Sequence, residues 1–223
     1  MACCCSPSGP SKSRAVVSEP TGRHRGLLVD YGGVLTTDLF DSFRAFCGSQ
    51  GLEPDVLMRQ FRGNTEAREL LIELETGRME ELAFEERLGA LLGISPENLI
   101  DGLFAGAVAD EAMIAAVRAA RRAGIRTGLI SNSWGTRRYD HAQLSELFDG
   151  VVISGDVGMR KPAPEMYRLG AERIGVPPEQ SVFVDDLPFN LAPAAELGMA
   201  TVHHVETDRT IAELERLLGV SLA

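Results

Sequence analysis

Three short apolar runs of the sequence each lead directly into polar side chains that could take part in catalysis. The residues at these three places are Asp30, the pair Ser131 and Asn132, and the pair Asp185 and Asp186. A further apolar run at 151–153 is followed by Lys161. If the runs are strands of an open parallel sheet, their carboxyl ends border the crevice in which such sheets bind ligands. We therefore expect three acids, one hydroxyl and one cation to converge on one crevice.

This expected cluster is rich in negative charge. Three carboxylates at close range do not all stay ionised unless a cation lies between them. Oxygen-rich clusters of this kind suit Mg2+, which is a hard cation that prefers carboxylate and carbonyl ligands. The residue types at the predicted strand ends therefore predict Mg2+ as a cofactor.

The elements that position these residues follow from the pattern of the sequence. Short apolar runs alternate with amphipathic stretches in 25–37 and 109–223. The predicted strands are 26–30, 125–130, 151–153, 181–184 and 200–205, and the predicted helices are 110–124, 139–148, 163–174, 187–197 and 207–218. Such alternation gives a parallel sheet covered by helices on both faces. We predict an α/β fold with a doubly wound, Rossmann-like parallel sheet.

Residues 38–108 have a different pattern, with apolar residues at helical spacing and no strand signal. Amphipathic stretches cover 40–46, 56–61, 70–74 and 82–92. A fifth helix is predicted to start with Ser95 as its N-cap and Pro96 as its first residue. The predicted domains are a small all-helical cap at 38–108, a core at 25–37 and 109–223, and a disordered tail at 1–24, which is rich in Ser, Pro, Gly and Arg.

Composition excludes several classes of protein. The 223 residues are 44% hydrophobic and 24% charged, as in ordinary globular chains. A net charge of -10 disfavours nucleic acid and anionic membranes as partners. The sequence has no run of 18 apolar residues, so we expect no transmembrane segment. The four cysteines form no disulfide framework and the first residues lack the apolar region of a secretory signal, which predicts a cytoplasmic location.

The polar residues belong to four short motifs. The motifs are Asp30 to Leu35, Leu129 to Ser133, Lys161 to Tyr167, and Phe183 to Asp186 with Asn190. In this order they resemble the motifs of the haloacid dehalogenase superfamily of hydrolases, and the resemblance is specific because all four occur together. The helical segment after the first motif resembles the small cap of the family's first subclass. The segment 155–167 is most similar to the branch that holds the phosphatase domain of soluble epoxide hydrolase and bacterial sugar-phosphate phosphatases.

The resemblance implies the roles of the acids. Asp30 would be the nucleophile and would form an aspartyl-phosphate. Asp30, the carbonyl of Gly32 and Asp186 would bind Mg2+, and Asp185 would hold a metal-bound water. This division of roles fits phosphoryl transfer, which needs in-line placement and positive charge more than elaborate covalent steps.

The resemblance also implies how substrate is bound. Ser131 and the main-chain amide of Asn132 would hold the phosphoryl oxygens, and Lys161 would neutralise the nucleophile and the transferring group. The sequence supports Lys161 independently, because only Lys12 and Lys161 are lysines among 22 Lys and Arg residues. Lys12 lies in the predicted tail. A single compact ammonium among arginines indicates a place where a guanidinium does not fit, and chance survival of one lysine is the alternative.

One position departs from the family pattern. Most phosphatases of the family have a second Asp two residues after the nucleophile, where it protonates the leaving oxygen, and here that residue is Gly32. Loss of a general acid lowers the rate by on the order of 10²–10⁴. A good leaving group, as in a sugar 1-phosphate or an acyl phosphate, depends less on this acid. Thr36, Thr37 and Asp38 are the candidate replacements.

Other side chains have less specific interpretations. They are the aromatic residues Trp134 and Tyr139, the histidines His203 and His204, and the arginines Arg59, Arg62 and Arg68. For the aromatic pair, lining of the crevice and core packing both stay open. We expect the histidines to be structural or exposed. The arginines are expected to be exposed helix charges, with contact to an anionic substrate group as the alternative.

The sequence thus predicts Mg2+-dependent hydrolysis of a small phosphorylated metabolite by a monomer or homodimer. A first alternative is a 2-haloacid dehalogenase, which resembles this chain in its Asp nucleophile but needs no metal. In that branch a Tyr typically lies two residues after the nucleophile, whereas Tyr31 lies one residue after Asp30. A second alternative is a weakly active or inactive protein of this fold that binds a phosphorylated ligand, because Gly32 lacks the acid.

Overall fold

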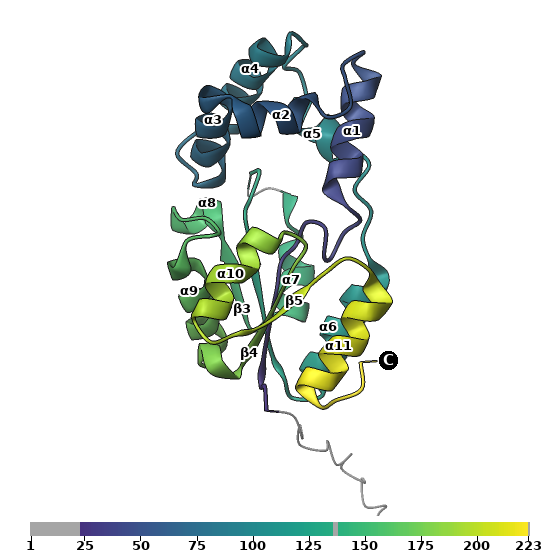
Figure 1. The fold of residues 1–223 in the computed structure, drawn as a ribbon, viewed down its shortest axis with the longest axis vertical. Helices are drawn as coiled ribbons and strands as arrows, with labels where there is room; N and C mark the ends of the chain where they lie inside the picture. Colours follow the sequence, from purple (N-terminus) through teal and green to yellow (C-terminus); the bar gives the residue numbers. More distant parts are fainter. Residues whose placement is uncertain (1–22, 136–137, 223) are drawn as a thin grey trace, which may run out of the picture.

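The computed structural model describes residues 23–135 and 138–222 (Figure 1). All but the last two residues of the predicted tail, 1–24, lie outside this part of the chain. None of the helices in the described ranges combines the length and the apolar character needed to cross a bilayer.

Five parallel strands form one sheet in the order β3-β2-β1-β4-β5. Their bounds are β1 Gly26–Val29, β2 Arg126–Ser131, β3 Gly150–Ile153, β4 Ser181–Asp185 and β5 Ala200–His203. The strands consist largely of buried residues because helices cover both faces, which explains why they read as continuous apolar runs. The predicted α/β class and parallel sheet are confirmed. Ser131 and Asp185 are the last residues of their strands rather than the first residues after them.

Alternate residues of the central strand face two separate apolar clusters. Leu27 and Val29 pack with residues of α6 (Glu111–Arg122), α7 (His141–Leu147) and α11 (Thr207–Leu218), whereas Leu28 packs with α9 (Pro164–Ile174) and α10 (Pro188–Glu196). Figure 1 shows α6 and α11 on one side of the sheet and α9 and α10 on the other. Two elements were not predicted, α8 (Ser154–Val157) and a 3-10 turn (Pro178–Gln180), because each is too short to show a helical period.

Five helices precede α6 and form a group of their own, which we call the helical unit. They are α1 Leu39–Ser49, α2 Val56–Gly63, α3 Thr65–Glu75, α4 Glu81–Leu92 and α5 Leu99–Phe104. Their buried apolar side chains form a third cluster, distinct from the two beside the sheet. Figure 1 shows the helical unit beyond the end of the sheet, opposite the end at which the chain enters β1. The predicted domain limits at 38 and 108 stay a prediction.

The fifth helix begins later than predicted. Ser95 and Pro96 were expected to start it, but α5 begins at Leu99, after Asn98 in a left-handed conformation with φ 53°. The hydroxyl of Ser95 instead accepts the N–H of Glu97 over 3.3 Å within a turn. The prediction is wrong because Ser-Pro suits a turn as well as a helix start, and Pro96 packs so closely on α4 that a Cβ on Gly89 would lie 3.2 Å from it.

Candidate active site

The register of the parallel strands brings the acids together. Val29 of β1 pairs with Val184 of β4, and the N–H of the next residue, Asp30, donates to the carbonyl of Val184 over 2.9 Å. The strand order reverses at β1, which is the switch point where open sheets bind ligands. Each of the three acids contributes an oxygen to a group whose members lie within 4.8 Å of one another, namely Asp30, Asp185 and Asp186.

Lys161 lies between two of these acids. Its side chain is 1% exposed, and its Nζ is 2.8 Å from Oδ1 of Asp30 and 2.7 Å from Oδ2 of Asp185. It stands between α8 and α9, before a cis peptide bond to Pro162. The N–H of Tyr31 also donates to Oδ1 of Asp30, over 2.7 Å. Both of these contacts to Asp30 use the same oxygen.

Burial dominates the electrostatics of the cluster. It raises the pKa of the Asp30 carboxyl to about 8, although Lys161 opposes the rise, and Asp185 and Asp186 add to it. Burial and Asp185 raise the pKa of Asp186 to about 6. Burial lowers the pKa of Lys161, but the attraction of Asp30 and Asp185 is larger and leaves it above its ordinary value. The ammonium is therefore ionised, and Asp30 and Asp186 carry charge only at a cost.

The donor set fits a hard divalent cation. Three carboxylates face a single ammonium, which leaves two formal negative charges when all groups are ionised. Asp186 forms no ion pair with any residue in the described ranges. Carboxylate oxygens at close range, with an excess of negative charge, are the ligands that Mg2+ prefers. These residues therefore fit Mg2+, as the sequence predicts.

The glycine turn after Asp30 has two different constraints. Gly33 has φ 72°, and a Cβ there would lie 2.6 Å from Oδ2 of Asp186, so this position requires glycine. Gly32 is not in the left-handed region, but a Cβ on it would overlap Cδ1 of Leu39 in α1. Leu39 therefore occupies the space into which a side chain at position 32 would extend.

The three candidate replacements for the missing acid hold the turn and the start of α1. The hydroxyl of Thr36 accepts the N–H of Gly33 over 3.1 Å. The hydroxyl of Thr37 accepts the N–H of Val108 over 3.1 Å. The carboxylate of Asp38 accepts the N–H of Phe40 over 2.7 Å and caps α1. Each side chain has a local structural function that explains its type.

The last residue of β2 and the residue after it, Ser131 and Asn132, contribute two polar side chains. The hydroxyls of Ser131 and Tyr139 lie 2.9 Å apart, and both residues are buried. The side chain of Asn132 holds the main chain of Lys161, accepting its N–H over 2.8 Å and donating to its carbonyl over 3.1 Å. The phosphate-binding roles of Ser131 and of the Asn132 amide stay predictions. The side-chain role of Asn132 was not foreseen.

Asp185 is held from three directions. Its Oδ1 accepts the N–H of Leu187 and the amide of Asn190, each over 2.9 Å, and its Oδ2 contacts Lys161. Asn190 belongs to the fourth motif, which gave it no role. Its spacing five residues after Asp185, on the first turn of α10, could have indicated this contact. Full burial of Asp185 is thus matched by a full set of partners.

The less specific predictions have distinct outcomes. Trp134 packs among aromatic rings of the helical unit and Tyr139 joins the core cluster beside the sheet, so core packing applies to both. His204 is buried with its Nδ1 2.9 Å from the hydroxyl of Thr210, and His203 is exposed with its Nε2 3.0 Å from the carbonyl of Asp186. The three arginines are exposed, as expected; they are Arg59, Arg62 and Arg68.

Sequence reasoning missed Glu75 and Arg160. Nε of Arg160 lies 2.8 Å from Oε2 of Glu75, whose side chain is only 6% exposed. Arg160 directly precedes Lys161, which could have drawn attention to it. Glu75 gave no signal, because an acid at the end of an amphipathic helix is ordinarily solvated.

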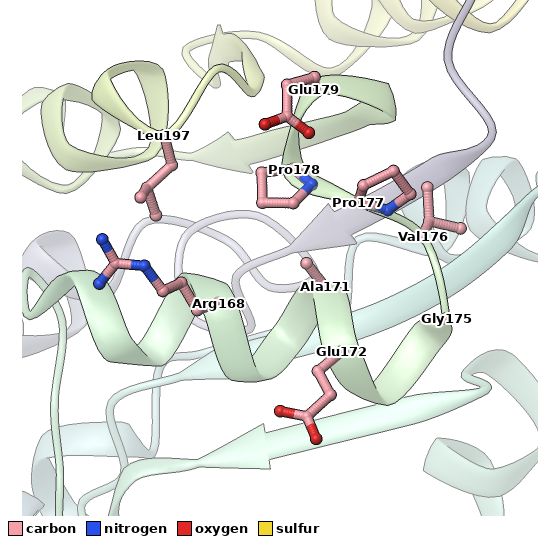
Figure 2. Close-up of a pocket in the computed structure, with 9 residues that line it drawn as sticks. All are labelled: Arg168, Ala171, Glu172, Gly175, Val176, Pro177, Pro178, Glu179 and Leu197. Carbon is pink, nitrogen blue, oxygen red and sulfur yellow. The ribbon is translucent and has the colours of Figure 1, made fainter.

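A cavity of about 480 Å3 lies away from the strand-end cluster (Figure 2). It is bordered by α9, the turn before β4 and the end of α10. Its lining is Arg168, Ala171, Glu172, Gly175, Val176, Pro177, Pro178, Glu179 and Leu197. None of these residues is a catalytic candidate, so this cavity is not the site described above.

A model of the haloacid dehalogenase-like hydrolases matches residues 24–198, about three quarters of the chain. The bifunctional epoxide hydrolase 2 of Mus musculus is 35% identical over 136 residues, which are 56% of this chain and 24% of the relative. A sesquiterpene phosphatase of Aspergillus oryzae is 29% identical over 157 residues, which are 66% of this chain and 78% of the relative. The chain thus spans about a quarter of the length of the epoxide hydrolase that it matches.

A solved structure has the same fold. A family enzyme of Bacteroides thetaiotaomicron, in complex with magnesium and inorganic phosphate, superposes with a TM-score of 0.60 at 21% identity. The match covers 82% of this chain and 94% of the other. At this identity the likeness concerns the fold alone.

Proposed function

The chain belongs to the haloacid dehalogenase-like hydrolase family, and from this premise we propose that it hydrolyses a small phosphate monoester with Mg2+ through an aspartyl-phosphate on Asp30. The observation that carries the proposal is the group at the strand ends formed by the buried residues Asp30, Asp185 and Lys161 and the partly buried Asp186. A phosphatase among the relatives and a structural neighbour solved with magnesium and phosphate support the same reaction.

In the first step, a carboxylate oxygen of Asp30 attacks phosphorus. The new O–P bond forms as the ester O–P bond breaks, and the leaving oxygen takes its proton from water, because Gly32 supplies no acid. Lys161, which contacts Oδ1 of Asp30, opposes the rise in the pKa of that carboxyl and faces the negative charge that spreads over the phosphoryl oxygens. Ser131 and the main-chain amide of Asn132 would bind those oxygens. Water then attacks phosphorus, which releases phosphate and restores Asp30.

Asp30, Asp186 and the carbonyl of Gly32 would hold Mg2+, with Asp185 binding it through water. When bound, Mg2+ supplies positive charge that lowers the pKa values of the two raised carboxyls and stabilises the transferring phosphoryl group. Asp185 is less free to move than Asp186, because Leu187, Asn190 and Lys161 already hold both of its oxygens. This difference supports an indirect role for Asp185.

The substrate class follows from the missing acid. Leu39 fills the space beside Gly32, so no protonated side chain stands at that position to assist the leaving oxygen. Esters whose leaving group has a low pKa, such as anomeric, acyl and aryl phosphates, need little protonation in the transition state. We therefore propose a small phosphate ester with a good leaving group, with a sugar 1-phosphate as the first candidate.

Phosphate release from an aryl phosphate and from a panel of sugar phosphates, with Mg2+ and with EDTA, tests the proposal. We expect release with Mg2+, loss of release with EDTA, and preference for sugar 1-phosphates over 6-phosphates. Metal-independent halide release from 2-chloropropionate would instead identify a dehalogenase. Tight binding of a phosphorylated ligand without turnover would identify a binding protein. Either result would overturn the proposal.

A further inference from the structure

Arg160 links the helical unit to the residue that we assign to the reaction. Its Nε lies 2.8 Å from Oε2 of Glu75 at the end of α3. The same Nε donates to the carbonyl of Lys161 over 3.2 Å. Arg160 and Glu75 are 24% and 6% exposed in their side chains, so the contact is largely shielded from water.

The main chain of Lys161 is held on both sides. Asn132 accepts its N–H and donates to its carbonyl, and Arg160 adds a second donor to that carbonyl. The side chain extends from this fixed point to place Nζ between Asp30 and Asp185. A misplacement of about 1 Å in a catalytic group can lower a rate by about 10². The anchors of the main chain therefore bear on the chemistry.

Glu75 is itself held against the core through the main chain. The hydroxyl of Ser154, in α8, donates to the carbonyl of Glu75. Gly77, two residues later, has φ 68°, and a Cβ there would lie 2.5 Å from the carbonyl of Gly155. This close approach fixes the end of α3 on α8. The Glu75 carboxylate consequently reaches Arg160 only when the helical unit lies in this position.

The charge of Glu75 is expensive to bury, which argues against simple filling of space. Burial raises the pKa of its carboxyl to about 7, although Arg160, Lys161 and a hydrogen bond from Trp134 act to lower it. An apolar side chain of similar size would pack at this position at lower cost. We therefore infer that the pairing of the Glu75 carboxylate with Arg160 has a function.

We propose that Glu75 is a positioning residue for Lys161, acting through Arg160. Docking of the helical unit sets the Glu75 carboxylate on Arg160, and Arg160 in turn fixes the carbonyl of Lys161. The ammonium then meets Asp30 in the geometry that the reaction requires. The consequence for turnover rests on the proposed function, whereas the placement of the ammonium does not.

Three variants distinguish a role of Glu75 in placing the Lys161 ammonium from a role only in holding the helical unit on the core. Glu75→Gln removes the charge that holds Arg160. Arg160→Lys keeps an ion pair with Glu75 but lacks the guanidinium that also reaches the Lys161 carbonyl. Asp101→Asn is the control, because it weakens another pair between the helical unit and the core, that of Arg138 with the more exposed Asp101, which does not touch Lys161. We expect kcat on an aryl phosphate to fall about tenfold in the first two variants, with KM nearly constant, and to change little in the control.

A signal from Lys161 gives a readout that needs no turnover. The chain has only two lysines, so labelling of the lysine Cε with carbon-13 gives two signals, which Lys12→Arg assigns. At one pH and without metal, we expect the Lys161 signal to shift or broaden in Glu75→Gln and to stay in place in Asp101→Asn. An unmoved signal in Glu75→Gln, or wild-type kcat in Arg160→Lys, would overturn the proposal. If the wild type releases no phosphate from any ester, the proposed function fails and the lysine signal still decides the positioning role.

Discussion

The strand-end site and the interior of the helical unit are stabilised in different ways. At the site, Asp30, Lys161 and Asp185 are buried charges, and each is held by an opposite charge and by hydrogen bonds. The interior of the helical unit is mainly apolar, and the partly buried ring of Trp134, which comes from the loop after β2, packs against it. Four phenylalanines surround that ring at centroid distances of 5.3 to 5.7 Å, namely Phe43, Phe61, Phe84 and Phe104.

This difference predicts that substitutions in the two regions affect different properties, the reaction rate at the site and the stability in the helical unit. Removal of one partner from a buried charge network leaves the others uncompensated and misplaced, so the reaction rate should fall steeply. Truncation in an apolar cluster leaves a cavity, so stability should fall while the chemistry keeps its groups. The two regions are therefore distinguishable by whether a substitution acts on kcat or on the free energy of unfolding.

The largest effect is expected for Asp30→Asn. The amide has nearly the same shape but cannot attack phosphorus, so kcat should fall by more than about 10⁴. Phosphate release measures the rate, and circular dichroism should show an unchanged fold. Retention of more than a few per cent of the activity would remove Asp30 from the role of nucleophile.

Lys161→Arg is expected to rank next. The position is 1% exposed, and a planar guanidinium needs more room than the ammonium that contacts Asp30 and Asp185. We expect kcat to fall by about 10²–10³ although the charge is kept. Steady-state kinetics on an aryl phosphate test this. A near-normal kcat would mean that only the charge matters at this position.

Trp134→Ala probes the other region. Loss of the ring from the centre of the aromatic cluster should lower the free energy of unfolding by about 3 kcal/mol. Urea unfolding followed by circular dichroism measures the change, and Phe189→Ala, at a residue that is 56% exposed, serves as the control. We expect a smaller loss of kcat than in Lys161→Arg. The reverse order of the two losses would break the distinction between the regions.

Gly32→Asp combined with Leu39→Ala tests the place where the two regions meet, because Gly32 belongs to the strand-end site and Leu39 to the helical unit. The single change at Gly32 meets the side chain of Leu39, whereas the double variant has room for the carboxyl. We expect the double variant to raise the rate on alkyl phosphates by about tenfold and to change aryl phosphates little, because only the alkyl leaving groups need a proton. A plot of rate against leaving-group pKa measures this, with a shallower slope expected for the double variant. An unchanged slope would mean that another group supplies the proton.

The last prediction concerns pH and the stability of the metal-free protein. The pKa of Asp30 is raised from 3.8 to about 8 in the folded state, so the folded protein binds a proton that the unfolded chain has lost between these values. The stability that this proton contributes is lost as pH rises through about 8. Asp30→Asn should therefore become more stable relative to the wild type between pH 5 and pH 8. Thermal unfolding in EDTA measures the difference, and a gap that does not vary with pH would contradict the pKa.

Much of the fold and part of the site could be read from the sequence. Buried parallel strands are continuous apolar runs, and the polar residues at their ends, such as Asp30 and Asp185, stand out against them. The helices of the helical unit were equally visible from their apolar period. The start of α5 was misplaced because Ser95 and Pro96 fit a turn as well as a helix, and the packing of Pro96 on α4 decides between them.

The set of elements and the chemical groups at the strand ends could be predicted from the residues alone, because both depend on local patterns of hydrophobicity and residue type. Three contacts could be found only in the folded protein: Leu39 fills the space beside Gly32, Trp134 enters the helical unit and Glu75 reaches Arg160. These contacts join residues that are distant in the chain or lie on different elements. No periodicity encodes such pairs, since they arise when separately folded elements pack and their side chains compete for the same volume.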